Sequence, residues 1–183
     1  MMYERFKTKA TGAQAEVHRF PTRAAALDFL AGFLNQEQSA DAQNATALVA
    51  ASMGLADAER ERLAACPGVH FDVTRERAAQ AMIGISQMDW ALADTGTLVH
   101  DATAAEERLV STLPAIHIAL VPSSGLYPDL PSLLAQIDPR RSRYLAFITG
   151  PSRTADIERV LTIGVHGPKR LIALFVDDLK ARA

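Results

Sequence analysis

Residues 115–125 read AIHIALVPSSG, and this stretch carries the clearest signal for the fold class. Its first part, residues 115–121, is apolar apart from His117, and a Pro-Ser-Ser-Gly turn then ends the run. A short, continuous apolar run that is bounded by turn residues is typical of a strand buried on both faces of a sheet. Such strands belong mainly to parallel sheets, so this segment predicts an α/β protein.

Similar apolar runs lie on both sides of this segment and alternate with stretches of helical composition. The predicted strands are residues 45–51, 69–73, 98–99, 115–121, 144–149 and 171–176. The predicted helices are residues 24–34, 56–65, 75–82, 104–109, 130–137 and 156–161. Strands that alternate with helices predict a mostly parallel sheet with both faces covered. In such sheets, ligands bind at the loops that follow the carboxyl ends of the strands.

The composition limits the classes of partner. Hydrophobic residues make up 49% and charged residues 22% of the 183 residues, as in ordinary globular domains. The net charge of −2 and the pI near 6.2 argue against nucleic acid or anionic lipid, because no broad basic field is present. The aliphatic runs are too short to cross a bilayer, and the first residues lack the apolar centre of a signal peptide. We therefore expect a cytoplasmic protein without membrane insertion.

The single cysteine, Cys66, excludes several kinds of site in this chain. One thiol cannot form an intrachain disulfide, a four-cysteine zinc site or a thiolate-ligated iron–sulfur cluster. The sequence also contains no Walker motif, no paired histidines at metal-ligand spacing and no G-x-S-x-G elbow. We therefore expect no metal site.

The first dozen residues are polar and small and show no periodicity. This pattern predicts a flexible N-terminal arm over residues 1–15, or an arm that docks on a partner, followed by a single domain over residues 16–183.

The segment at residues 93–98, ADTGTL, is the first candidate site. Gly96 would allow close approach of a ligand to the backbone, and Thr95 and Thr97 would offer hydroxyl groups beside the Asp94 carboxylate. The alternative is a plain turn between strands, with these polar side chains bound to nearby backbone.

Two further candidates lie on either side of the turn at Pro114. Arg108 could bind a carboxylate or a phosphate through two hydrogen bonds, or it could form a surface ion pair with Glu106 or Glu107. His117 lies within the central apolar strand, where a packed, hydrogen-bonded histidine is as plausible as a functional one.

The segment at residues 150–158, GPSRTADIE, directly follows a predicted strand and enters a predicted helix. Its backbone N–H groups could bind an anion at the positive end of the helix dipole. Gly150, Ser152, Thr154 and Asp156 are the candidate residues. The alternative is a self-capped helix, with Ser152 or Thr154 as its N-cap.

The segment at residues 164–168, GVHGP, places His166 between two glycines and therefore in a loop. There an imidazole could transfer protons or bind a ligand, or it could be an exposed histidine in a tight turn.

Taken in order, these motifs resemble the lactate-utilisation protein C family, which is built on the LUD domain. The resemblance rests on ADTGTL (93–98), Glu107-Arg108, Leu113-Pro114, His117, GPSRTADIE (150–158) and GVHGP (164–168), and it covers roughly residues 80–178. It implies a fold of the NagB/RpiA/CoA-transferase type, a three-layer α/β/α sandwich. The family commonly has Glu where this chain has Asp94.

The resemblance also implies a function. Family members are typically encoded with two partners that carry iron–sulfur clusters, and together they support oxidation of L-lactate to pyruvate. We therefore expect an accessory subunit that itself binds no cofactor, with the clusters in the partner subunits. The resemblance leaves open whether this subunit is catalytic.

The predicted site combines the four loops. We expect Arg108 and the N–H groups near Ser152 and Thr154 to hold a small anion, with Asp94 and His166 as candidates for proton transfer. The other predicted ligand-binding residues are Thr95, Gly96, Thr97, Gly150 and Asp156. The competing interpretation is a stand-alone enzyme that acts on a sugar phosphate or a CoA ester. A CoA transferase would need a nucleophilic carboxylate, for which Asp94 and Asp156 are the candidates. The apolar C-terminal strand with Phe175 also allows a homo-oligomer.

Overall fold

The predicted strand around residue 118 is the centre of a six-stranded sheet in the computed structural model, which describes residues 1–40, 45–154 and 162–181. Strand β7 (Ile116–Pro122) is buried along its whole length and pairs in parallel with β12 (Arg170–Val176) and β4 (Ile83–Gln87). Strand β1 (Glu16–Phe20) extends the sheet beyond β12. Beyond β4 lie β2 (Ala47–Val49) and β3 (Val69–His70). The order is β1-β12-β7-β4-β2-β3, and every neighbouring pair is parallel, which confirms the α/β prediction.

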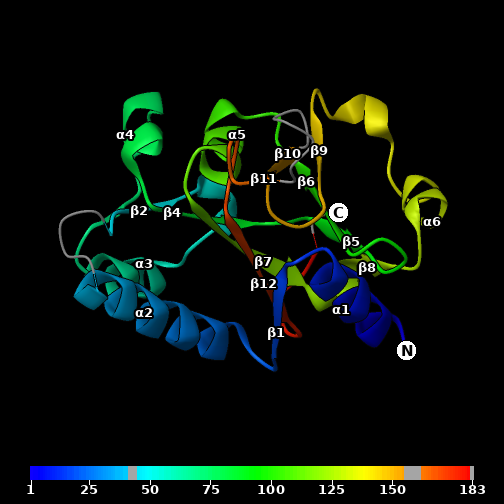
Figure 1. Ribbon diagram of the computed structural model, residues 1–183. Helices are drawn as coiled ribbons and strands as arrows, with labels where there is room; N and C mark the ends of the chain where they lie inside the picture. The colour runs from blue at the N-terminus through cyan, green and yellow to red at the C-terminus, as the bar shows by residue number, and fades with distance from the viewer. Residues whose placement is uncertain (41–44, 155–161, 182–183) are drawn as a thin grey trace.

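Helices cover both faces of this sheet (Figure 1). The α-helices are α1 (Met2–Gly12), α2 (Arg23–Ala40), α3 (Asp57–Ala64), α4 (Arg75–Gln80), α5 (Ala105–Thr112) and α6 (Leu130–Leu134). Short 3-10 turns occur at η1 (Ala51–Met53), η2 (Ser123–Gly125) and η3 (Pro139–Arg141). None of the helices that the structure describes combines the length and the apolar composition that a bilayer crossing requires.

Side-chain alternation along the strands divides the core into two faces. On one face, Ile118 of β7 and Leu174 of β12 pack with α2 and α3 through residues such as Leu30. On the other face, Val121 and Phe175 pack with α1 and with the neighbouring small sheet. The central strands are thus apolar on both sides, which explains their continuous hydrophobic sequence.

The small sheet was not predicted from the sequence. It has four strands in the order β8 (Leu126–Tyr127), β5 (Trp90–Leu92), β6 (Thr97–Asp101) and β9 (Leu145–Ile148). The pairs β5–β6 and β6–β9 are antiparallel, so the predicted strands at 98–99 and 144–149 belong here and not to the parallel sheet. A two-stranded ladder joins β10 (Arg153–Thr154) to β11 (Thr162–Ile163). The helix expected at residues 156–161 lies outside the described residues.

The prediction of a flexible arm over residues 1–15 is wrong. Helix α1 occupies most of this segment, and its Phe6 is fully buried against Phe175, with ring centroids 4.8 Å apart. Ala10, one helical turn further along, is buried on the same side. An apolar stripe this narrow leaves the rest of the helix polar, which is why the sequence shows no clear periodicity.

Candidate functional site

A pocket of about 560 Å³ lies between α5, β9 and the loops that flank the β10–β11 ladder. Its walls include apolar side chains from β9 and from the start of β12, among them Leu145, Ile148 and Leu171. Polar groups enter from several directions. Arg108, Ser111, Thr149, Ser152 and His166 line the same space. A mainly apolar cavity with a few convergent polar groups is the usual form of a small-molecule site.

The pocket gathers some of the predicted site residues and leaves others outside. Arg108, Gly150, Ser152 and His166 line it, as the shared-site hypothesis requires. Thr97 stands behind this lining, because its hydroxyl is 2.8 Å from the hydroxyl of Thr149. Among the lining residues there is no Asp94, Thr95, Gly96 or Thr154. Asp156 lies outside the described residues.

The Arg108 side chain contacts two backbone carbonyl groups and one aromatic ring. Its Nη1 donates to the carbonyl oxygens of Ala102 and Thr103, and its guanidinium carbon lies 5.0 Å from the centre of the Tyr144 ring. Within the described part of the chain, no carboxylate forms an ion pair with Arg108. The carbonyl groups and the aromatic ring therefore orient the guanidinium and leave part of its donor set for a ligand.

Glycine is required at positions 96 and 150 by the close approach of helix α1 and its C-terminal end, and not by a ligand. Both have positive φ angles, 69° and 71°. A Cβ atom on Gly96 would lie 2.3 Å from the backbone nitrogen of Ala10, and one on Gly150 would lie 2.1 Å from the carbonyl oxygen of Ala13. The expectation that Gly96 admits a ligand is corrected accordingly, because the group that approaches its backbone is the N-terminal helix.

Asp94 occupies the turn between β5 and β6. Its backbone N–H donates to the carbonyl oxygen of Pro128, at 3.1 Å. The side chain is half-buried, and its Oδ1 has no hydrogen-bond partner among the described residues. His166 lines the pocket and Asp94 does not. The prediction that these two residues share one site is therefore wrong.

The loops at residues 150–154 and 164–168 are joined by backbone hydrogen bonds. The N–H of Ser152 donates to the carbonyl of Pro168, and the N–H of Gly164 donates to the carbonyl of Ser152, both at 2.8 Å. The N–H of Ser152 is therefore already bonded, which corrects the expectation that it holds an anion. His166 is exposed at the mouth of the pocket.

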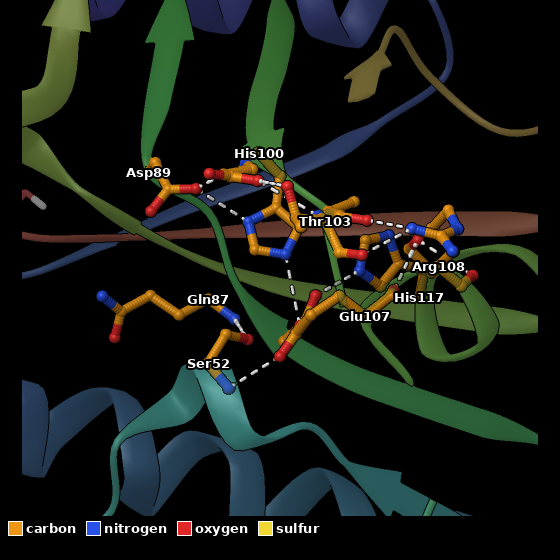
Figure 2. Close-up of polar contacts among 12 residues, drawn as sticks. Ser52, Gln87, Asp89, His100, Thr103, Glu107, Arg108 and His117 are labelled. Atoms are coloured by element: carbon orange, nitrogen blue, oxygen red, sulfur yellow. Dashed lines mark hydrogen bonds and ion pairs between the residues drawn. The ribbon is translucent and has the colours of Figure 1, made fainter. Parts of the chain in front are cut away.

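A buried charge cluster beside the pocket was missed from the sequence. Figure 2 shows the His100 imidazole between two carboxylates. Its Nδ1 is 2.9 Å from Oδ2 of Asp89, and its Nε2 is 3.2 Å from Oε2 of Glu107. Glu107 also accepts a hydrogen bond from the backbone N–H of Ser52 at 2.8 Å. The sequence contained a signal for this cluster, because Asp89 and His100 each stand next to an apolar run, Trp90–Leu92 and Leu98–Val99. A charged side chain buried at such a position needs a partner, because an unpaired buried charge is costly.

The distances in this cluster fit a protonated imidazole that donates from both ring nitrogens. Ionised carboxylates only accept hydrogen bonds, so both ring nitrogens of His100 must donate. Burial opposes the charge, but the hydrogen bonds to Asp89 and Glu107 outweigh it and raise the pKa of His100 to about 9. Burial likewise acts to raise the pKa of Glu107, and the hydrogen bonds from His100 and Ser52 outweigh it and lower that pKa. The cluster thus fixes the first turn of α5, which carries Arg108.

His117 is fully buried and belongs to the pocket lining. Its Nε2 lies 2.8 Å from the hydroxyl of Ser86, whereas its buried Nδ1 has no partner among the described residues. Burial, aided by the positive charge of His100, lowers the pKa of His117 to about 3, so the ring is neutral at physiological pH. Of the two alternatives left open by the sequence, the packed, hydrogen-bonded histidine describes Nε2 but does not account for Nδ1.

Over residues 1–40, 45–154 and 162–181, no group of three His, Cys, Asp or Glu side chains is arranged to hold a metal ion. Cys66 is buried in the core on the α2 side of the parallel sheet.

Comparison with known proteins relates this arrangement to a family. The family model of the LUD domain matches residues 3–176, a range that includes all of helix α1 except Met2. A lactate utilization protein C from Halalkalibacterium halodurans is 39% identical over 109 residues, which are 56% of this chain and 47% of that protein. A protein of the same name from Exiguobacterium sp. is 40% identical over 114 residues, 59% of this chain and 50% of that protein. The matches thus span about half the length of these relatives.

A solved structure shares the fold. It is the crystal structure of a DUF162 family protein from Deinococcus radiodurans, with a TM-score of 0.66 over 96% of each chain. Since the sequences are 20% identical, this similarity concerns the fold alone.

Proposed function

The chain belongs to the LUD domain family, and on this basis we propose that it is an accessory protein of L-lactate utilisation that binds a small carboxylate anion at Arg108. The names of its relatives support the lactate-utilisation role. The pocket beside α5 supports the binding role. The proposal places the protein in the cytoplasm, together with the partners that carry out the oxidation.

The observation that carries the binding role is the guanidinium of Arg108. It lies in a pocket with mainly apolar walls and has no carboxylate partner among the described residues. Arginine binds carboxylates through two parallel hydrogen bonds, and such charge-assisted bonds are stronger in a partly dehydrated site. A small carboxylate would therefore complete the pairing of this side chain.

The proposal assigns electron transfer to partner subunits with iron–sulfur clusters. Oxidation of L-lactate to pyruvate removes two electrons and two protons, and such clusters accept electrons one at a time. The single cysteine of this chain is buried in the core and cannot supply the set of thiolates that a cluster needs. The part of this chain would be to bind the organic acid or to present it to those partners.

The alternative of a CoA transferase finds less support in the pocket. An enzyme of that kind needs a nucleophilic carboxylate, and no Asp or Glu lines the described part of the pocket. Asp94, the first candidate for that role, sits in the β5–β6 turn instead.

A charge substitution tests the binding role. We expect Arg108→Gln to weaken binding of L-lactate and propionate by about tenfold or more, because a hydrogen bond to a charged group contributes roughly 1.5–3 kcal/mol. Isothermal titration calorimetry would measure both dissociation constants. Arg140→Gln is the matched control, since the Arg140 side chain is 89% exposed and pairs only with its neighbour Asp138 among the described residues. Equal affinity in the two variants would contradict the role of Arg108.

The same variants test the role in the cell. We expect Arg108→Gln to slow growth on L-lactate, and not on glucose, in a host whose own copy of the gene is deleted, whereas Arg140→Gln restores normal growth.

Anaerobic affinity purification from lactate-grown cells tests the partner assignment. We expect cysteine-rich proteins with broad iron–sulfur absorption to copurify. A colourless protein recovered alone would contradict the accessory role and would leave the binding measurements unaffected.

A further inference from the structure

We propose that His117 is a ligand-contacting residue that selects for a second polar group, so that the pocket takes a carboxylic acid bearing a hydroxyl or carbonyl group on an apolar body. This inference rests on the proposed anion site at Arg108 and names the class of ligand for it.

The first support is the unpartnered ring nitrogen of His117. Buried polar groups are hydrogen-bonded in the great majority of cases, because loss of hydration without a replacement partner costs about 1–3 kcal/mol. The His117 side chain is fully buried, its Nε2 contacts the Ser86 hydroxyl, and its Nδ1 has no partner in the described ranges. Because His117 also lines the pocket, a bound ligand can supply the partner that Nδ1 lacks.

The second support is the chemistry of a neutral imidazole. Its lowered pKa keeps His117 uncharged at physiological pH, so one ring nitrogen donates and the other accepts. The Ser86 hydroxyl can play either role opposite Nε2. Nδ1 can therefore donate to a carbonyl oxygen or accept from a hydroxyl group. The carboxylate itself is better matched by the charged Arg108, which leaves a neutral polar group of the ligand for His117.

The third support is the size and lining of the pocket. Its volume of about 560 Å³ is typical of pockets that take drug-sized ligands, so a three-carbon acid would leave most of it unfilled. Leu145, Ile148 and Leu171 contribute apolar surface to its walls. Burial of an alkyl chain against such walls is favourable, so affinity should rise with the length of that chain.

Two matched pairs of acids test the inference. The pairs are propionate with L-lactate, and 4-methylpentanoate with 2-hydroxy-4-methylpentanoate; the members of each pair differ only by one hydroxyl group. We expect the hydroxy acid of each pair to bind the unmodified protein about tenfold more tightly, as one added hydrogen bond implies. We also expect the longer pair to bind more tightly than the shorter pair. Calorimetry would measure all four dissociation constants.

Substitutions of His117 assign the preference to this residue. We expect His117→Phe, which keeps a ring of similar size without hydrogen-bonding atoms, to abolish the preference for the hydroxy acids. Any loss of affinity for propionate and 4-methylpentanoate should be smaller than the loss for the two hydroxy acids. We expect His117→Asn, which retains a polar group close to the position of Nδ1, to keep part of the preference. A purely structural histidine would change all four affinities together.

A measurement on the unmodified protein covers the case in which a variant does not fold. In protein with ¹⁵N-labelled histidine, the Nδ1 resonance of His117 should shift on addition of 2-hydroxy-4-methylpentanoate and not on addition of 4-methylpentanoate. Equal responses to both acids, or equal affinities within each pair, would overturn the inference and leave the anion site intact. Absence of binding for all four acids would overturn the anion site of the proposed function as well.

Discussion

Glu107 and Arg108 are neighbours in the sequence, and the fold gives them opposite environments. Successive residues of an α-helix point about 100° apart, so α5 directs Glu107 into the buried cluster with His100 and Arg108 toward the pocket. The ion pair that fixes the helix is thus separate from the cation that faces a ligand. The sequence allowed an ion pair between Arg108 and Glu107, and His100 takes that partner instead.

The protonation of His100 should make stability depend on pH. A group whose pKa is raised on folding stabilises the native state fully below its ordinary pKa, here 6.5, and loses that contribution as the pH rises through its folded value of about 9. We therefore expect the free energy of unfolding of the unmodified protein to fall by a few kcal/mol between pH 6.5 and 9. Urea unfolding at a series of pH values would measure it.

The variant His100→Gln removes the titrating group. Its deficit in stability relative to the unmodified protein should be largest near pH 6.5 and should shrink as the pH approaches 9. His70→Gln is the control, because His70 is exposed. A deficit that is independent of pH would show that His100 is neutral in the folded protein.

At the scale of elements, helix α1 explains two of the glycines that the motifs contain. Gly96 lies in the turn before β6 and Gly150 in the loop after β9, and both contact the C-terminal half of α1 or the residues just after it. The positive φ angles and the close backbone approach leave no room for a side chain at either position. The Thr-Gly-Thr and Gly-Pro-Ser motifs therefore serve in part to dock this helix.

The variant Gly96→Ala tests this docking. We expect it to lower the free energy of unfolding by at least about 2 kcal/mol, because a left-handed conformation alone costs roughly 1–2 kcal/mol for a residue with Cβ, and the contact with Ala10 adds to that cost. Hydrogen exchange of α1 should increase at the same time. Gly32→Ala, at an exposed position of α2 with open space around it, should instead be neutral or stabilise by up to about 1 kcal/mol. Unchanged exchange in α1 of Gly96→Ala would contradict the docking.

At the scale of the whole molecule, one sheet joins two apolar cores. The strands β7 and β12 contribute alternate residues to the core under α2 and to the core under α1. A substitution that weakens the packing on either face therefore destabilises the same two strands. We expect the described chain to unfold as one cooperative unit, which is usual when a single sheet carries both cores.

Truncation on each face tests this cooperativity. Phe6 in α1 and Leu30 in α2 are both fully buried, on opposite faces. We expect Phe6→Ala and Leu30→Ala each to lower the free energy of unfolding by roughly 2–5 kcal/mol. Both should lower the temperature of the same melting transition by about 2–4 °C per kcal/mol. Differential scanning calorimetry would show a single peak in each variant. A separate early transition in Phe6→Ala alone would mean that α1 unfolds independently.

Much of the fold was accessible from the sequence because the relevant signals are local. Continuous apolar runs predicted β7, β12 and β2, and helical composition predicted α2, α3, α4 and α5, with errors mainly at the ends. Helix α1 was not predicted because only Phe6 and Ala10 are buried in it, and two residues do not make a recognisable apolar pattern. The small sheet escaped because short strands such as β5 and β8 gain their stability from pairing partners that are distant in the sequence.

Local sequence patterns were thus enough for the α/β class with a mostly parallel sheet, for the family motifs and for the candidate cation Arg108, although strands β1 and β4 of that sheet were not predicted. Which of these residues come into contact depends on the packing of the whole chain. That packing joined Thr97 to Thr149 across 52 positions and enclosed His100 between two carboxylates. It also placed His117 in the lining of a pocket and Asp94 outside it. The physical reason is that burial follows from local apolar patterns, whereas a site depends on contacts between side chains that only the packed chain brings together.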